Sequence, residues 1–183
     1  MNISAPFIAQ FFISQLKQVL PFTDIIIGNE TEAEAWATAN KLPATKGSSD
    51  EDFTKYLQAV AKNLATFEKK NDRPRTVVIT QGPKSTIVVT STAPDSPKVY
   101  GVHPVTDDQI VDTNGAGDAF AGGFLGALVA GKSLDECVET GHKMGAMSVQ
   151  QVCFLLSLNV KSILIRLCRS DLNTNGQRSK NFK

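Results

Sequence analysis

Two glycines and an acid stand together where an extended stretch gives way to a helix. Gly115, Gly117 and Asp118 follow apolar residues, and apolar residues recur at helical spacing after them. Glycine lets backbone N–H groups approach a ligand, and the unpaired N–H groups of a helix N-terminus bind anions. A carboxylate beside bound phosphate can act as the base of a phosphoryl transfer. We predict an anion hole at Gly115, Ala116 and Gly117, with Asp118 as general base.

A structural interpretation competes with each of these roles. An acid such as Asp118 in the first turn of a helix also interacts favourably with the helix dipole. Gly115 and Gly117 are also typical of a tight turn that needs a positive φ. The residues by themselves are compatible with both interpretations.

The run from Asp112 to Phe124, DTNGAGDAFAGGF, resembles the signature of ribokinase-like carbohydrate and nucleoside kinases. Asn114 favours the adenosine kinase branch. Residues 1–8 and 27–33 resemble segments of the same branch, in the same order. The resemblance extends to about Val152 and implies a ribokinase-like α/β fold that is incomplete at its N-terminus.

This resemblance implies a reaction. The γ-phosphate of ATP would move to the 5′-hydroxyl of adenosine to give AMP, a step of purine salvage, and Asp118 would take the hydroxyl proton. ATP and magnesium are the implied cofactors. Potassium is implied as well, because the stretch that contains Asp112 and Thr113 lies near a monovalent-cation site in the family. The full-length family is implied to be monomeric and cytoplasmic, with the nucleus as a second compartment. A sugar kinase of the same superfamily is the alternative, as is a truncated fragment that only binds nucleotide.

Polar residues follow a predicted buried strand, at the end where open α/β sheets bind ligands. Asn29 and Glu32 match the family's Asn-x-x-Glu motif, which implies that Asn29 contacts the ATP phosphates and Glu32 holds magnesium through water. One carboxylate and several waters suit magnesium. The competing interpretation is a helix cap, because Asn is a good N-cap and a Glu three residues later completes a capping box.

Four further positions are implied to contact ATP. Thr80, Gln81 and Gly82 follow another predicted strand, although any strand that leads into a turn has this pattern. The resemblance also places His142 near the base of ATP. A lone histidine on a helix is commonly a buried structural residue instead.

Residues 126–133 fit the P-loop pattern G-x-x-x-x-G-K-S. A P-loop must follow a strand, whereas here a predicted helix precedes the pattern. Gly131 is expected to end that helix, and Ser133 to open the next one with a capping box to Glu136. We therefore expect no P-loop.

The elements that position these residues alternate along the chain. Strands are predicted at 1–4, 24–27, 76–80, 85–89 and 98–102, and helices at 6–20, 30–38, 51–69, 115–130 and 134–149. The first helix is expected to carry one apolar stripe, and Trp36, Phe120 and Phe124 are expected in the core. This alternation predicts an α/β fold with a mostly parallel sheet flanked by helices.

Bulk properties narrow the classes of protein. The 183 residues are 42% hydrophobic and 20% charged, which fits one globular domain. A net charge of +1 argues against nucleic-acid binding. The three cysteines form no close pair, so we expect a reduced, intracellular protein. The N-terminal stretch has no cationic start and is broken by polar residues, so neither a signal peptide nor a membrane span is expected.

The resemblance divides the chain in two. Residues 1–152 correspond to the C-terminal, ATP-binding portion of a family that is roughly twice as long as this chain. Residues 153–183 depart from the family pattern, and their polar composition predicts a disordered tail, derived from another exon, a retained intron or a shifted frame. Most substrate contacts belong to the other half of the family, so we expect little activity from this chain alone. Parallel strands without their sheet neighbours leave open edges, so we also expect weak stability.

Overall fold

The computed structural model describes residues 1–43, 47 and 49–151. The chain divides into two compact units, Met1–Val102 and His103–Lys183, and each is described by itself. The predicted tail at 153–183 lies outside the described residues.

The first unit is built on a sheet of four strands in the order β1-β2-β3-β4. These are β1 (Ile25–Asn29), β2 (Thr76–Thr80), β3 (Ser85–Thr90) and β4 (Lys98–Gly101), close to the predicted ranges. Strands β1 and β2 are parallel, while β3 is antiparallel to both β2 and β4. The sheet is therefore mixed rather than mostly parallel. The reason lies in the short connection from β2 to β3, because a tight turn can join only antiparallel strands.

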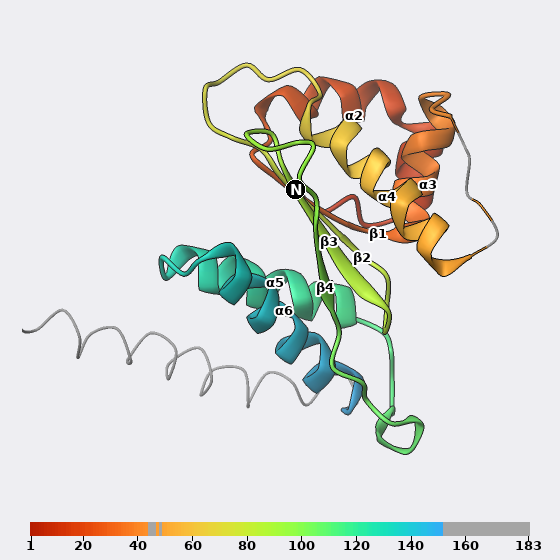
Figure 1. Cartoon of the computed structure of the whole chain (residues 1–183), viewed down its shortest axis with the longest axis vertical. Helices are drawn as coiled ribbons and strands as arrows, with labels where there is room; N and C mark the ends of the chain where they lie inside the picture. The colour runs from red at the N-terminus through yellow and green to blue at the C-terminus, as the bar shows by residue number, and fades with distance from the viewer. Residues whose placement is uncertain (44–46, 48, 152–183) are drawn as a thin grey trace, which may run out of the picture. The chain divides into compact units, whose positions relative to one another are not determined.

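Helices link the two parallel strands. After β1 come α3 (Glu30–Ala39) and α4 (Asp50–Ala65), which pack against each other and against the sheet (Figure 1). The apolar face of α4 is buried and contacts β2 and β3. Trp36 of α3 is fully buried, as predicted, and its indole N–H donates to Asn63 Oδ1 at 2.9 Å. This layer of helix on sheet forms the main core.

The segment before β1 differs from its prediction. Two short helices, α1 (Pro6–Phe11) and α2 (Ile13–Val19), and the 3-10 turn η1 (Leu20–Phe22) replace the single helix expected at 6–20. Phe12 separates the helices with φ −118° and ψ 27°. A break of this kind rotates one helix relative to the other, so the apolar residues cannot form one buried stripe. Residues 1–4 contribute one parallel bridge, from Asn2 to Ile27, instead of a strand.

Arg75 joins the ends of several elements just before β2. Its side chain is 0% exposed, and its guanidinium N–H groups donate to five backbone carbonyls at 2.6–3.0 Å. The acceptors lie around η1 and the end of α4: Leu20, which follows α2 and opens η1, Thr23, Leu64, Phe67 and Glu68. Carbonyls at helix ends lack the next helical N–H. The Leu20 and Leu64 carbonyls also accept backbone N–H groups, from Thr23 at 3.0 Å and from Phe67 at 3.4 Å, so Arg75 adds a second donor there. Arginine is seldom fully buried, so sequence pattern alone does not indicate this role.

The second unit is a helical pair preceded by the 3-10 turn η2 (Asp107–Gln109). Helix α5 (Ala116–Val129) and helix α6 (Leu134–Val149) run side by side (Figure 1). A Cβ added at Gly123 would lie 2.6 Å from Met144 Cγ and 2.9 Å from the Thr140 carbonyl, so glycine allows the close approach. Phe120, Phe124 and Cys137 are buried, as was predicted for the two phenylalanines.

Residues 126–133, which fit the P-loop pattern, form the end of one helix and the start of the next. The expectation that they form no P-loop is confirmed. Helix α5 occupies its first half, and Gly131 turns the chain with φ 76°. Ser133 and Glu136 then form a capping box at the start of α6. Within the described part of the chain, no helix is long and apolar enough to cross a membrane.

Candidate functional site

The loop that enters α5 has the geometry of an anion site. Gly115 is the N-cap residue, with φ 79°, a conformation that glycine adopts without strain. Before it, the Asn114 N–H donates to Asp112 Oδ1 at 2.9 Å. The N–H groups of Val111 and Asp112 both donate to the Val149 carbonyl, at 2.8 and 3.2 Å. The end of α6 thus holds the loop that opens α5.

Gly117 has no structural reason to be glycine within the described residues. Its φ lies outside the left-handed region, and an added Cβ would meet nothing within 4 Å. The N–H groups of Gly117 and Asp118 have no acceptor among the described residues, as expected in the first turn of a helix. Asp118 lies in the same turn and is exposed. Open donors beside an exposed carboxylate can bind a phosphate and accept a proton.

A second group of predicted residues lies at one edge of the sheet in the first unit. Asn29 and Thr80 are the last residues of β1 and β2, and they are partners in the parallel register. Thr80 Oγ1 donates to the Gly28 carbonyl at 3.4 Å. The sheet therefore places the ends of both strands together, as expected for a ligand-binding edge.

Asn29 and Glu32 form a complete capping box at the start of α3. Asn29 Oδ1 accepts from the Glu32 N–H at 2.9 Å, and Glu32 Oε2 accepts from the Asn29 N–H at 3.0 Å. Glu32 is only 4% exposed, and its Oε2 lies 2.9 Å from the position of a Cβ at Gly28. A carboxylate that holds hydrated magnesium must face water. The geometry fits the cap better than the predicted magnesium role.

Gln81 and Gly82 form the turn between β2 and β3. Gln81 is 4% exposed, and its Oε1 accepts from the Ser85 hydroxyl and, at 3.5 Å, from Thr54 Oγ1 of α4. Gly82 has φ 53° and open space around it. These contacts favour the interpretation of a strand that leads into a turn, with the Gln81 side chain tied to α4.

His142 lies inside the helical pair. It is 7% exposed, and its ring centroid lies 5.6 Å from that of Phe120. Burial lowers its pKa, the Glu139 carboxylate raises it, and His103 lowers it further. This environment favours the structural interpretation of His142 over contact with a nucleotide base.

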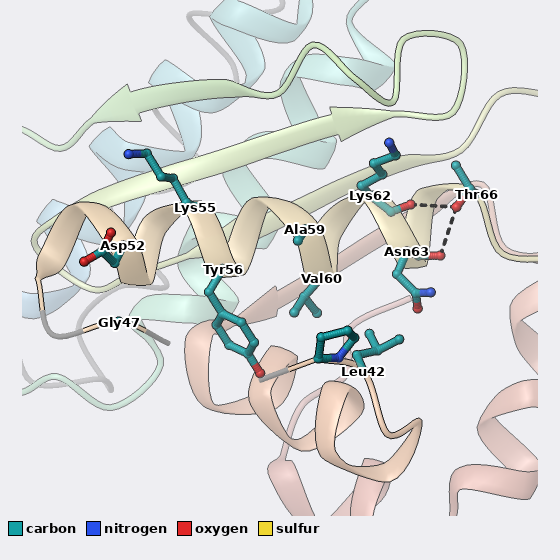
Figure 2. A pocket seen from close by; sticks show the side chains of 11 residues that line it. Leu42, Gly47, Asp52, Lys55, Tyr56, Ala59, Val60, Lys62, Asn63 and Thr66 are labelled. Carbon is teal, nitrogen blue, oxygen red and sulfur yellow. Dashed lines mark hydrogen bonds between the residues drawn. The ribbon is translucent and has the colours of Figure 1, made fainter. Parts of the chain in front are cut away.

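A cavity of about 710 Å³ lies along α4 in the first unit (Figure 2). Tyr56 and Val60 point from the helix toward Leu42, whereas Lys55 and Lys62 point away from it. None of the predicted site residues lines it. Among the described residues, no group of three or more His, Cys, Asp or Glu side chains could hold a metal ion.

Comparisons with known proteins match both the signature and the fold. The model of the pfkB family carbohydrate kinases matches residues 1–154. The chain belongs to the pfkB family. The predicted resemblance and the α/β, ribokinase-like class are thereby confirmed.

The curated relatives of this pfkB-family chain include named adenosine kinases. It is 52% identical to the adenosine kinase of Schizophyllum commune over 153 residues, which cover 83% of this chain and 42% of that protein. The adenosine kinase of Schizosaccharomyces pombe is 42% identical over 146 residues, 79% of this chain and 39% of that protein. The chain thus spans about two fifths of the length of these relatives.

Solved structures of adenosine kinases have a similar fold over the matched region. Anopheles gambiae adenosine kinase, in complex with a di(adenosine-5) tetraphosphate, is 35% identical with a TM-score of 0.74, covering 86% of this chain and 43% of that chain. Apo adenosine kinase of Trypanosoma brucei brucei is 38% identical with a TM-score of 0.72, covering 82% of this chain and 42% of that chain. The fold is that of the adenosine kinases over the matched region.

Proposed function

We propose that this chain carries the catalytic portion of an adenosine kinase, which transfers the γ-phosphate of ATP to the 5′-hydroxyl of adenosine. The observation that supports it most directly is the exposed Asp118 carboxylate beside the open N–H groups of Gly117 and Asp118. The named relatives support adenosine as the substrate, because they are adenosine kinases and a solved one from Schistosoma mansoni is in complex with adenosine and AMP. A sugar kinase of the same family is the second candidate, since the family model is named for carbohydrate kinases.

In the proposed reaction, Asp118 takes the proton of the 5′-hydroxyl, and that oxygen attacks the γ-phosphorus. The bond from the γ-phosphorus to the bridging oxygen of ADP breaks, and AMP and ADP leave. Negative charge on the transferred group is stabilised by the N-terminal end of α5 and by the open N–H groups of Gly117 and Asp118, whereas the Ala116 N–H of the predicted 115–117 set already donates to the Thr113 carbonyl at 3.4 Å. Gly117 has no positive φ that a turn would require, and open space surrounds it, so the absence of a side chain suits a ligand.

The metal ions have different support. Magnesium enters this proposal with ATP, and no step is assigned to Glu32, because its carboxylate is buried in the α3 cap. Potassium rests on the resemblance at Asp112 and Thr113, and one Asp112 oxygen already accepts from Asn114. ATP contacts by Asn29, Thr80 and Gly82 are proposed at the sheet edge, whereas Gln81 and His142 act through packing.

Two measurements of AMP formation from adenosine and MgATP test the reaction. One uses the purified chain. The other uses a chimera in which residues 1–152 replace the matched region of the Schizophyllum commune enzyme, so that the rest of a kinase is present. We expect Asp118→Asn to lower the rate of the chimera by about 10²- to 10⁴-fold, the usual contribution of a general base.

The matched control is Asp135→Asn, which changes an acid in the first turn of α6 instead of α5. It should leave the rate within about twofold. A chimera with Asp118→Asn as active as its parent would remove Asp118 as the base. Phosphorylation of ribose or fructose in place of adenosine by the purified chain itself would favour the sugar kinase.

A further inference from the structure

One buried hydroxyl of the second unit has no hydrogen-bond partner. Ser148 lies in the last turn of α6 and is 0% exposed. Among the described residues, its Oγ is the only buried side-chain nitrogen or oxygen that lacks a partner. A hydroxyl on a helix commonly donates to the carbonyl four residues earlier, as Thr140 of the same helix does to Glu136 at 2.8 Å. Ser148 makes no such bond, and a buried polar group without a partner is rare enough to need a reason.

Ser148 lies on the side of α6 that packs against α5. Gly145 and Gly141 lie one and two turns earlier on that side. A Cβ at Gly141 would lie 2.8 Å from the Phe120 ring, and one at Gly145 would lie 3.5 Å from the Ala116 carbonyl. The contacts therefore move toward the start of α5 as α6 proceeds. Ser148 comes next on this side, which brings it to the loop that enters α5.

Backbone hydrogen bonds also join this end of α6 to that loop. The carbonyl of Val149, the residue after Ser148, accepts the N–H groups of Val111 and Asp112. Within the loop, the Ala116 N–H donates to the Thr113 carbonyl at 3.4 Å, which is long for such a bond. If a phosphate takes the Ala116 N–H, a loop carbonyl loses its donor and needs another one.

We propose that Ser148 is a positioning residue of the anion site at the start of α5. Its hydroxyl is the donor that can bind a carbonyl of the loop at 112–115 when a nucleotide phosphate takes the loop N–H groups. This bond would hold the loop against α6 in the arrangement that binds phosphate. The inference rests on the proposed function, because it needs the phosphates of ATP at this helix start.

Thermal unfolding of the full chain, with and without MgATP, tests this role. A ligand that binds the folded chain raises the midpoint of unfolding as its concentration increases, and the rise gives its affinity. Ser148→Ala should leave the midpoint without nucleotide unchanged, because the hydroxyl has no partner in the protein. It should weaken the affinity for MgATP about tenfold, the effect of one lost hydrogen bond.

The matched control is Thr140→Val, which removes the other hydroxyl of α6, whose bond to Glu136 lies away from the loop. It should leave the affinity for MgATP unchanged. Equal affinities of Ser148→Ala and the parent chain would overturn the inference. A lower midpoint of Ser148→Ala without nucleotide would also do so, since the hydroxyl would then serve the fold alone. A parent chain that MgATP does not stabilise would overturn it as well, whereas the Asp118→Asn chimera would still test the proposed reaction separately.

Discussion

Arg75 directs its whole side chain to backbone carbonyls at the ends of η1 and α4. All of its bonds are internal, and the side chain is fully buried. Burial lowers its pKa, and Asp24 opposes that shift. A guanidinium has five donors in a fixed plane, which an ammonium group cannot reproduce.

Arg75→Met is therefore expected to lower the free energy of unfolding by about 3 kcal/mol, because five hydrogen bonds from a charged donor are lost, although the Leu20 and Leu64 carbonyls keep a backbone donor. Arg75→Lys should recover only part of this loss. Urea denaturation followed by circular dichroism measures it. The exposed neighbour provides a control, because Arg73→Met should change stability by less than about 0.5 kcal/mol. Equal values for both variants would show that the Arg75 contacts do not stabilise the fold.

Protonation of His142 makes the stability of the helical pair depend on pH. Its folded-state pKa lies below the ordinary value of 6.5, chiefly because of burial. The unfolded chain therefore binds more protons than the folded chain just below that value, and stability falls as the pH drops from about 7 to 5. Thermal unfolding across this range should show the loss, and His142→Gln should reduce it.

Nearby charges set the size of this effect. Glu139 raises the pKa of His142 and His103 lowers it, so His103→Gln should bring the acid-induced loss down slightly. The pKa values of Asp24 and Glu139 are lowered, chiefly by hydrogen bonds from Lys69 and Lys143. Protonation of these carboxylates therefore removes stability only at more acidic pH. An unchanged pH profile in His142→Gln would assign the loss to other groups.

At the level of helices, two adjacent glycines of α5 have opposite environments. Gly123 faces α6, where a Cβ would come within 3 Å of Met144 and of the Thr140 carbonyl. Gly122 faces open space, with nothing within 4 Å of an added Cβ. The same change at the two positions therefore separates packing from helix propensity.

Gly123→Ala should destabilise the chain by about 1–3 kcal/mol through overpacking. Gly122→Ala should stabilise it by up to about 1 kcal/mol, because alanine is the better helix former. Chemical denaturation of the two variants measures both signs. Destabilisation by both would mean that the outer face of α5 is also tightly packed.

Helices and strands with strong local signals were predicted well from sequence. Strand β2 and helix α6 have their predicted bounds, because a run of β-branched residues and a Ser133–Glu136 capping box define them locally. The break at Phe12 and the exposed phenylalanines were missed, since periodicity does not show which side of a helix is covered. The direction of β3 depends on the turn at Gln81, which was predicted without its consequence for pairing.

The candidate site was predictable in part for the same reason. The turn at Gly115 and the cap formed by Asn29 and Glu32 follow from residue types at fixed spacing. Burial of Gln81, His142 and Arg75 depends on contacts with residues distant in sequence, which no local pattern contains. Burial therefore changed the interpretation of the first two and revealed the third.

At the scale of the whole molecule, the chain is matched over about two fifths of the length of its relatives. Because it spans about two fifths of them, we expect AMP formation by the isolated chain to be at least about 10²-fold slower than by the chimera, a loss typical of missing substrate positioning. Parallel assays at equal protein concentration measure the ratio. Equal rates would show that the described units suffice for catalysis.

The buried thiol of Cys137 makes the helical pair observable in solution. It is 0% exposed, and burial, followed by Glu136, raises its pKa. A thiolate-directed reagent can reach it only when the packing around α6 opens. With Cys153→Ser and Cys168→Ser in place, the labelling rate of Cys137 measures how often that opening occurs. Mass spectrometry under native conditions follows the labelling.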